Sequence, residues 1–205
     1  MSTTAIPQDV PSGGLTPVGH VNGTFDFRTT RIEKNSTGSS DADLIYVGDI
    51  VRVNASGQAV RLVAGDTSAA GVTGGVMGVV AGMYADEAGK PLVFGLPVQS
   101  PRIALSADVR FLDVYTDPGI IYATRTAASA GSSFIGKTMN ITTTARNTAA
   151  GISGTIIDST SSAASENPVK VVAVSEYQLD TRKGSASGCV NVVLNNVMTK
   201  NMVSR

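Results

Sequence analysis

The sequence predicts an all-β protein, and three observations lead to that prediction. β-branched residues outnumber the other aliphatic ones, with 25 Val and 12 Ile against 9 Leu and 6 Met. Such side chains are stiff at χ1 and fit a pleated sheet better than a helix. Glycine, serine and threonine supply turns, and several apolar stretches alternate with a period of two. We expect a β meander that forms a sandwich or a barrel, with a jelly-roll-like arrangement as one option, and an extended N-terminal arm.

Proline and glycine dominate residues 1–24, which we expect to form that arm. No apolar pattern of strand or helix period occurs there, so the segment is ordered only against a partner. His20 lies within it. A catalytic histidine needs an orienting partner in a rigid site, so we expect a solvated or interface contact instead. Residues 25–205 are expected to form a single β domain that begins with a first or edge strand at residues 25–32.

The clearest hairpin follows a polar loop. Residues 44–53 are predicted to form one long strand, bulged at Gly48, and residues 58–63 return after the turn Asn54-Ala55-Ser56-Gly57. In the returning strand, the alternation puts Arg61 on one face and its apolar neighbours on the other. This pattern is typical of two antiparallel strands joined by a tight turn.

Two further hairpins are predicted. One runs from residues 76–84 to 91–98, and the other from residues 109–115 to 120–125. The second crosses the turn Asp117-Pro118-Gly119, where we expect Asp to cap the turn, Pro to fix φ and Gly to adopt a positive φ. Three successive hairpins make a β meander the economical arrangement.

Residues 126–167 are poor in large apolar side chains and rich in Ser, Thr and Ala. Only two short apolar islands interrupt them, at residues 134–135 and 152–157. We expect either a surface excursion or a segment ordered by neighbouring subunits. Strand patterns then return at residues 168–174 and 189–194.

Composition excludes several function classes. Lys plus Arg and Asp plus Glu are 16 each, so the net charge is zero, and a nucleic-acid-binding role is not expected. One His and one Cys exclude an internal disulfide framework and the usual Cys/His zinc site. Trp is absent and aromatic residues are 5%, which is little for a cofactor pocket. We therefore expect no enzyme activity, no cofactor and no metal.

The longest stretch without charge lies within residues 66–85. It has nearly the length of a membrane span, but Gly, Ala and Thr occupy its centre and no basic residues flank it. We expect no membrane insertion. The stretch is instead expected to be buried core or an oligomer interface.

One catalytic motif occurs by pattern alone. Residues 131–138 match the G-x-x-x-x-G-K-T expression of a phosphate-binding loop, with Lys137 and Thr138 as its functional residues. That chemistry needs a strand before the motif and a helix after it. The flanking residues are small and polar before it and β-prone after it. Nucleotide binding is therefore not expected. Cys189 is expected to be a small buried side chain rather than a nucleophile.

Three segments in order carry a resemblance to a known family: Gly48-Asp49-Ile50-Val51-Arg52-Val53, Ser56-Gly57-Gln58-Ala59-Val60-Arg61, and Gly75-Val76-Met77-Gly78-Val79-Val80-Ala81-Gly82. They resemble the small β proteins that decorate the capsids of tailed bacteriophages. Val169-Lys170-Val171-Val172 and Val190-Asn191-Val192-Val193-Leu194-Asn195 are similar to the closing strands of such decoration, or cement, proteins. The resemblance covers residues 44–98 and 168–196 and does not extend over residues 126–167.

The resemblance implies a non-enzymatic virion protein. Cement proteins bind the outside of the major capsid protein lattice and clamp neighbouring subunits, usually as homo-oligomers. For this chain a trimer is favoured and a dimer is the alternative. The implied location is the capsid surface of the virion, after synthesis in the bacterial host cytoplasm. The alternative function is a tail, head-fibre or receptor-binding protein.

Overall fold

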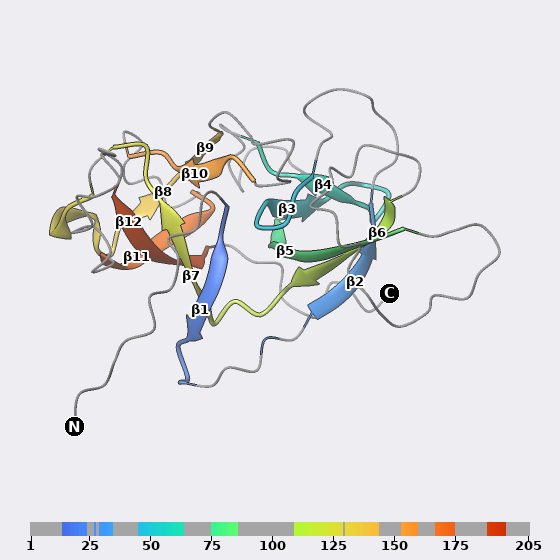
Figure 1. Cartoon of the computed structure of the whole chain (residues 1–205), viewed down its shortest axis with the longest axis horizontal. Helices are drawn as coiled ribbons and strands as arrows, with labels where there is room; N and C mark the ends of the chain where they lie inside the picture. The colour runs from blue at the N-terminus through green and yellow to red at the C-terminus, as the bar shows by residue number, and fades with distance from the viewer. Residues whose placement is uncertain are drawn as a thin grey trace.

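The computed structural model describes residues 14–23, 27, 29–34, 45–63, 75–85, 109–128, 130–143, 153–159, 167–174 and 188–195. Within these ranges the regular structure is strand, apart from a single 3-10 turn, η2 (Ser132–Phe134). Antiparallel sheets pack face to face as a sandwich (Figure 1). The all-β prediction is confirmed, and of the two predicted architectures the sandwich is the one that forms.

The first sheet has five strands in the order β1-β7-β12-β11-β8, all antiparallel. Its strands are β1 (Thr16–His20), β7 (Ile120–Arg125), β12 (Cys189–Leu194), β11 (Val169–Val174) and β8 (Thr138–Met139). Alternate residues of the three central strands are buried, as in a sheet with one face on the core. The two C-terminal strands expected from this alternation are confirmed.

The second sheet also has five antiparallel strands, in the order β2-β6-β5-β3-β4. Its strands are β2 (Thr29–Glu33), β6 (Val109–Tyr115), β5 (Val76–Ala85), β3 (Ile50–Val53) and β4 (Ala59–Arg61). The predicted edge strand near residues 25–32 is β2. A third, two-stranded sheet pairs β9 (Ile141–Thr143) with β10 (Thr155–Ile157).

The hairpin β3–β4 is confirmed, together with its turn. Asn54 Oδ1 accepts the N–H groups of Ser56 and Gln58 at 3.0 and 2.9 Å, and Gly57 has φ +79°. The first strand is shorter than predicted. It begins at Ile50 because Gly48, with φ +90°, turns the backbone out of the extended conformation before it.

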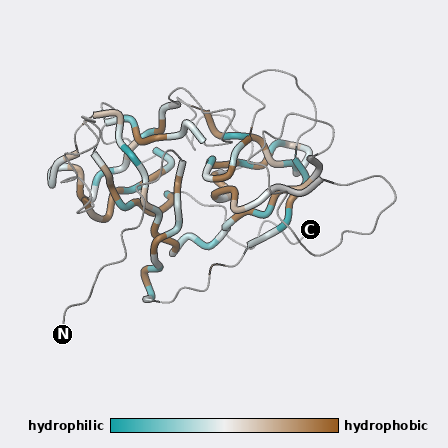
Figure 2. The backbone as a smooth tube through the Cα atoms, viewed as in Figure 1, coloured by the Kyte–Doolittle hydropathy of each residue, from teal (hydrophilic) through white to brown (hydrophobic). Residues whose placement is uncertain are grey.

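The main core lies between the two five-stranded sheets. Both sheets contribute to one continuous cluster of buried side chains, which the third sheet also joins. Hydrophobic residues, in brown, lie along strands of both five-stranded sheets (Figure 2). The buried members of the cluster are Leu15, Ile50, Leu62, Val76, Val79, Ile120, Tyr122, Ala130, Met139, Ile141, Ile157, Val169, Val171, Val190, Val192 and Leu194. Burial of this much apolar surface is the principal force that holds the sandwich together.

The second sheet also buries its other face. It does so by curling, so that side chains from its own strands pack against one another. The inner cluster is formed by Ile45, Val51, Ala59, Met77, Val80, Leu112 and Val114, with Ile32 and Val53 packed beside it. Apart from Ile45, these residues come from the five strands of one sheet, so the sheet must curl around them. A bridge between Lys34, after β2, and Ala59 of β4 joins the two edges. Only this one bridge joins them among the described residues, so the sheet is curled without being a closed barrel.

Two predicted hairpins have different outcomes. β6 and β7 flank the expected turn but do not pair, because β6 belongs to the second sheet and β7 to the first. The third hairpin is therefore wrong: its turn is a crossover between sheets, and a simple meander does not form. For the second hairpin, β5 is a strand as predicted, whereas its return at residues 91–98 lies outside the described residues.

The predicted N-terminal arm is wrong over its second half. Thr16–His20 form β1, which pairs with β7 in register Thr16↔Ala123 to His20↔Ile120 (Figure 1). Leu15 is 3% exposed and belongs to the main core. Backbone hydrogen bonds to β7 hold a strand that is poor in large apolar residues, which is why no apolar period marked it. Residues 1–13 lie outside the described residues.

The stretch 126–167 is not a surface excursion where it is described. Met139, Ile141 and Ile157 are each at most 1% exposed and belong to the main core. Thr126 also bridges to Ile157, which ties this stretch back onto the end of β7. The large residues are few, and most of the described ones are buried, although Ile135 is 51% exposed. The surrounding Ser and Thr conceal this pattern in the sequence.

Candidate functional site

The phosphate-loop match has a different structure from a phosphate-binding loop. η2 and a turn occupy residues 132–136, and β8 follows in place of a helix. The backbone N–H groups of Phe134, Ile135, Gly136 and Lys137 already donate to protein carbonyls, at 2.9 to 3.1 Å. A phosphate would need those N–H groups. The match is therefore a structural turn that docks on β11, where the Gly136 N–H bonds to the Val171 carbonyl.

His20 fastens β1 to the crossover between the sheets. Its side chain is 7% exposed, and its Nε2 lies 3.3 Å from Asp117 Oδ2. Nδ1 accepts the N–H of Asn22 at 3.1 Å, so in the neutral ring the proton is on Nε2 and faces the carboxylate. Both ring nitrogens are engaged, so this His–Asp pair holds structure. The expectation that His20 is solvated is wrong.

The crossover turn shows why Gly119 is a glycine. Asp117 Oδ1 accepts the Gly119 N–H at 2.8 Å, so Asp caps the turn as predicted. The positive φ expected for Gly119 is wrong, since the described glycines with positive φ do not include it. A Cβ at this position would lie 2.5 Å from His20 Nε2. The imidazole, not the backbone conformation, therefore requires the missing side chain.

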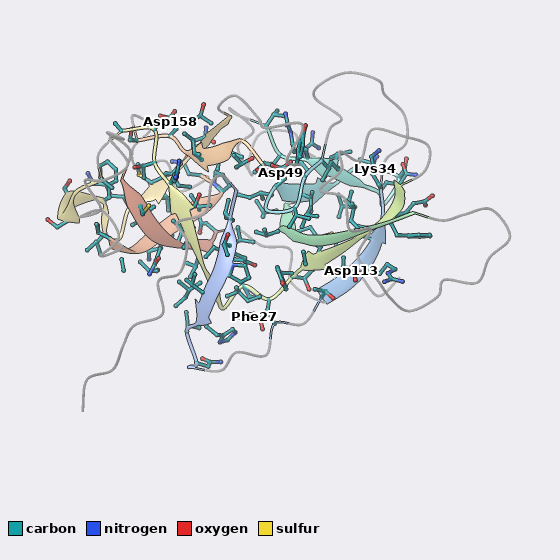
Figure 3. The ribbon with its side chains drawn as sticks, viewed as in Figure 1. Phe27, Lys34, Asp49, Asp113 and Asp158 are labelled. Atoms are coloured by element: carbon teal, nitrogen blue, oxygen red, sulfur yellow. The ribbon has the colours of Figure 1, made fainter. Side chains whose placement is uncertain are left out.

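A buried carboxylate, Asp49, joins two segments that are distant in sequence. It is 1% exposed and follows the turn at Gly48 (Figure 3). Its Oδ2 accepts the Tyr46 N–H at 2.9 Å, while Oδ1 accepts the hydroxyls of Thr155, at 2.8 Å, and Ser153. This network binds the segment before β10 to the curled sheet. Its sequence signal is the Gly48-Asp49 pair before an apolar strand, and this pair also belongs to the segments that carry the resemblance.

The N-terminal segment completes the same junction through its backbone. The N–H of Gly14 bonds to the Thr155 carbonyl at 3.0 Å, and that of Leu15 to the Gly48 carbonyl at 2.9 Å. A Cβ on Gly14, which has φ +76°, would lie 2.8 Å from Ser153 Cβ. Two backbones thus pack in contact around the Asp49 network, and only glycine permits that approach.

The first sheet presents an outer face, opposite the main core. We define this outer face as Ile121, Ala123, Lys170, Val172, Asn191 and Val193. The residues alternate with core residues on β7, β11 and β12, and the register aligns Lys170, Val193 and Ile121 across the strands. Val172 is 36% exposed. The face is mainly apolar and carries no carboxylate, so it suits a large protein contact better than a charged ligand.

Cys189 is buried at the start of β12, as expected, and is 7% exposed. Burial raises the pKa of its thiol, and the positive charge of Arg125 opposes that rise. A thiol with a raised pKa carries little thiolate at neutral pH and is a poor nucleophile.

Two carboxylates that are close in sequence, Asp113 and Asp117, each have a partner within the protein. Asp113 pairs with Arg31 at 2.9 Å across β6 and β2, and Asp117 caps the crossover turn. Asp41, Asp43, Asp86 and Glu87 lie outside the described residues. Among the residues that are described, no group of three His, Cys, Asp or Glu side chains gathers to hold a metal ion.

The described part of segment 66–85 is buried core. β5 is the central strand of the second sheet, and Val76, Met77, Val79 and Val80 are each at most 4% exposed. Of the two roles expected for this segment, core is the one that the described residues take. In the part of the chain that the structure describes, no helix is long and apolar enough to span a membrane.

Comparison with known proteins adds no family assignment. Scans against protein-family models, curated proteins and solved structures each find no match to this chain.

Proposed function

We propose that this chain is a virion structural protein that decorates and stabilises the capsid of a tailed bacteriophage. In this proposal it binds the outer surface of the major capsid protein lattice and clamps neighbouring subunits. It acts as a homo-oligomer, with a trimer favoured over a dimer, on the capsid surface of the virion after synthesis in the bacterial host. The proposal includes no catalysis and no cofactor, and neither nucleic acid nor membrane is a partner.

The observation that carries the proposal is the outer face of the first sheet. A sheet face that places Ile121, Val172 and Val193 beside Lys170, with Arg125 on the same side of β7, has the chemistry of a protein–protein contact. The main core, which both five-stranded sheets share, packs against the other side of this sheet. The resemblance of residues 44–98 and 168–196 to cement proteins supplies the kind of partner.

A second feature supports the same function. β1 is an edge strand of the first sheet, and residues 1–13 precede it. Edge strands accept an added strand from another chain through their backbone groups. A lattice offers many equivalent contacts, so weak individual contacts add to a firm attachment through avidity.

The experiment measures the mass of the purified chain by light scattering, alone and with phage heads that lack the protein. We expect a stable oligomer that co-sediments with heads to a saturating stoichiometry. Val172→Glu and Lys170→Glu, on the outer face, should each reduce that binding at least tenfold. Val47→Glu is the matched control, because Val47 is 46% exposed but lies before β3 in the other sheet. Circular dichroism verifies that all three variants fold.

Other outcomes contradict the proposal. A monomer that does not bind heads contradicts it and favours the tail, head-fibre or receptor-binding alternative, which binding to host cells then tests. Equal loss in the control variant contradicts the outer face as the contact. Removal of residues 1–13 tests the N-terminal segment without removing β1, which a deletion to residue 24 would destroy.

A further inference from the structure

Arg61 is a buried cation, and no ion pair to it forms within the described part of the chain. It is 8% exposed, and its Nε and Nη1 atoms have no hydrogen-bond partner among the described residues. A guanidinium remains protonated at any pH that a folded protein survives, so burial cannot neutralise it. An unpaired buried charge is strongly unfavourable, and such groups are found with an anion.

The place of Arg61 in the fold shows what surrounds it. Arg61 pairs with Val51, and Ala59 pairs with Val53, so the Arg61 side chain lies on the face of the inner cluster. The sequence pattern had separated Arg61 from Val60 and Leu62 correctly. The alternation in the sequence does not show that the face of β4 that carries Arg61 lies on the inside of a curled sheet.

A second buried cation lies at the same edge. Lys34 is 5% exposed and bridges to Ala59, two residues before Arg61 (Figure 3). It also follows Ile32 by two residues, and Ile32 packs on the inner cluster. The meeting edges of the curled sheet thus bring two positive side chains to one face.

Three of the five described carboxylates have other partners. Asp49 is bonded to Ser153 and Thr155, Asp113 to Arg31, and Asp117 to His20. We infer that the curled sheet binds an oxyanion at Arg61, between its edge strands β2 and β4. The ligand class is phosphate or carboxylate, because guanidinium N–H groups match the oxygens of both. This site is independent of the capsid-decoration proposal.

The test is thermal unfolding of the full chain in millimolar phosphate, sulfate or acetate, each compared with chloride at equal ionic strength. We expect a melting temperature that rises and saturates, by about 5 to 10 °C at one hundred times Kd. If the rise in melting temperature saturates with phosphate and sulfate but not with acetate, the ligand at Arg61 is a tetrahedral anion. Saturation with acetate assigns a carboxylate.

Two variants locate the effect. Arg61→Met should abolish the saturable rise, whereas Arg31→Met, which removes the same charge from an exposed ion pair, should retain it. If Arg61→Met does not fold, Arg61→Lys is the second variant, because it keeps the charge. In Arg61→Lys, the anion concentration that gives half of the rise in melting temperature should be at least tenfold higher than in the wild type.

The results that would overturn the inference are also distinct. A wild-type melting temperature that is the same in all four salts excludes the site, whatever the variants do. A melting temperature that rises linearly with salt concentration, to the same extent in the wild type and in Arg61→Met, reflects the general stabilisation by salts that are excluded from the protein surface. That result also rejects the site. Destabilisation by Arg61→Met without any anion dependence in the wild type means that the counter-charge lies within the chain.

Discussion

His20 Nε2 lies 3.3 Å from Asp117 Oδ2, and this contact joins the N-terminal strand to the crossover between the two sheets. The backbone repeats the connection, because the Val21 N–H bonds to the Gly119 carbonyl at 2.9 Å. The histidine is buried while the carboxylate is 44% exposed, so solvent screens the charge. The His20–Asp117 pair therefore contributes to stability mainly through packing and the position of the turn, and little through charge attraction.

A double-mutant cycle between His20 and Gly119 tests this contact. In the wild type, Gly119→Ala should reduce the free energy of unfolding by about 1–3 kcal/mol, because its Cβ would lie 2.5 Å from the imidazole. In a His20→Ala background the same change should cost less than about 0.5 kcal/mol, since the obstructing ring is gone. Urea unfolding measures all four proteins. Equal costs in the two backgrounds would show that the glycine serves the backbone and not the ring.

The Asp49 network predicts a large cost for a small change. Asp49→Asn retains the shape but replaces one acceptor oxygen with an NH2 group that faces donors. We expect a loss of about 2–4 kcal/mol in the free energy of unfolding. Asp113→Asn is the control, because Arg31, its partner, is 39% exposed, and it should cost less than about 1 kcal/mol. Similar losses in both variants would refute the special role of Asp49.

The strands could be predicted from the sequence where alternation was regular. β11 and β12 alternate core and outer-face residues, and the β3–β4 turn carries Asn54 and Gly57, whose conformations are local. Sheet membership could not be predicted in the same way. β6 and β7 alternate on either side of a tight turn, and that pattern is identical whether the strands pair or cross between sheets.

The sites depend on contacts between distant segments, which a local pattern does not contain. His20 meets Asp117, and Asp49 meets Thr155, only after both sheets have formed. Arg61 followed a polar–apolar alternation that usually marks an exposed face. It became buried because the second sheet curls until β2 and β4 meet, a property of the whole sheet.

Gly78, the third residue of β5, lies where the strand has no room for a side chain. A Cβ there would lie 2.0 Å from the Tyr115 carbonyl oxygen, within the sheet itself. Gly78→Ala should therefore reduce the free energy of unfolding by more than about 3 kcal/mol, because β5 and β6 must separate. Gly131→Ala is the control: its φ is −119° and its Cβ would meet only Ser133 Oγ at 3.8 Å. A stable, unchanged Gly78→Ala protein would contradict the close approach of these strands.

Stability should decrease in alkaline solution, because two buried acids, Cys189 and Tyr122, and the partly buried Tyr115 hold their protons in the folded state. Burial raises the pKa of Cys189, Tyr115 and Tyr122, and nearby negative charge at Tyr115 and Asp117 adds to the rise at Tyr122. The unfolded chain loses these protons first, from about pH 8.5 for the thiol and about pH 10 for the phenols. Between the unfolded and folded pKa the folded state binds more protons, so the free energy of unfolding falls as pH rises.

Urea midpoints at pH 7, 9 and 10.5 check this sign. We expect a decrease between pH 7 and 9 that Cys189→Ala removes, and a steeper decrease above pH 10 that the variant retains, since its tyrosines are unchanged. The native thiol should also react with iodoacetamide at pH 7.5 at least tenfold more slowly than in urea, because Cys189 is only 7% exposed. A midpoint that rises with pH would mean that the folded state releases protons first, which is the opposite of what burial of these groups requires.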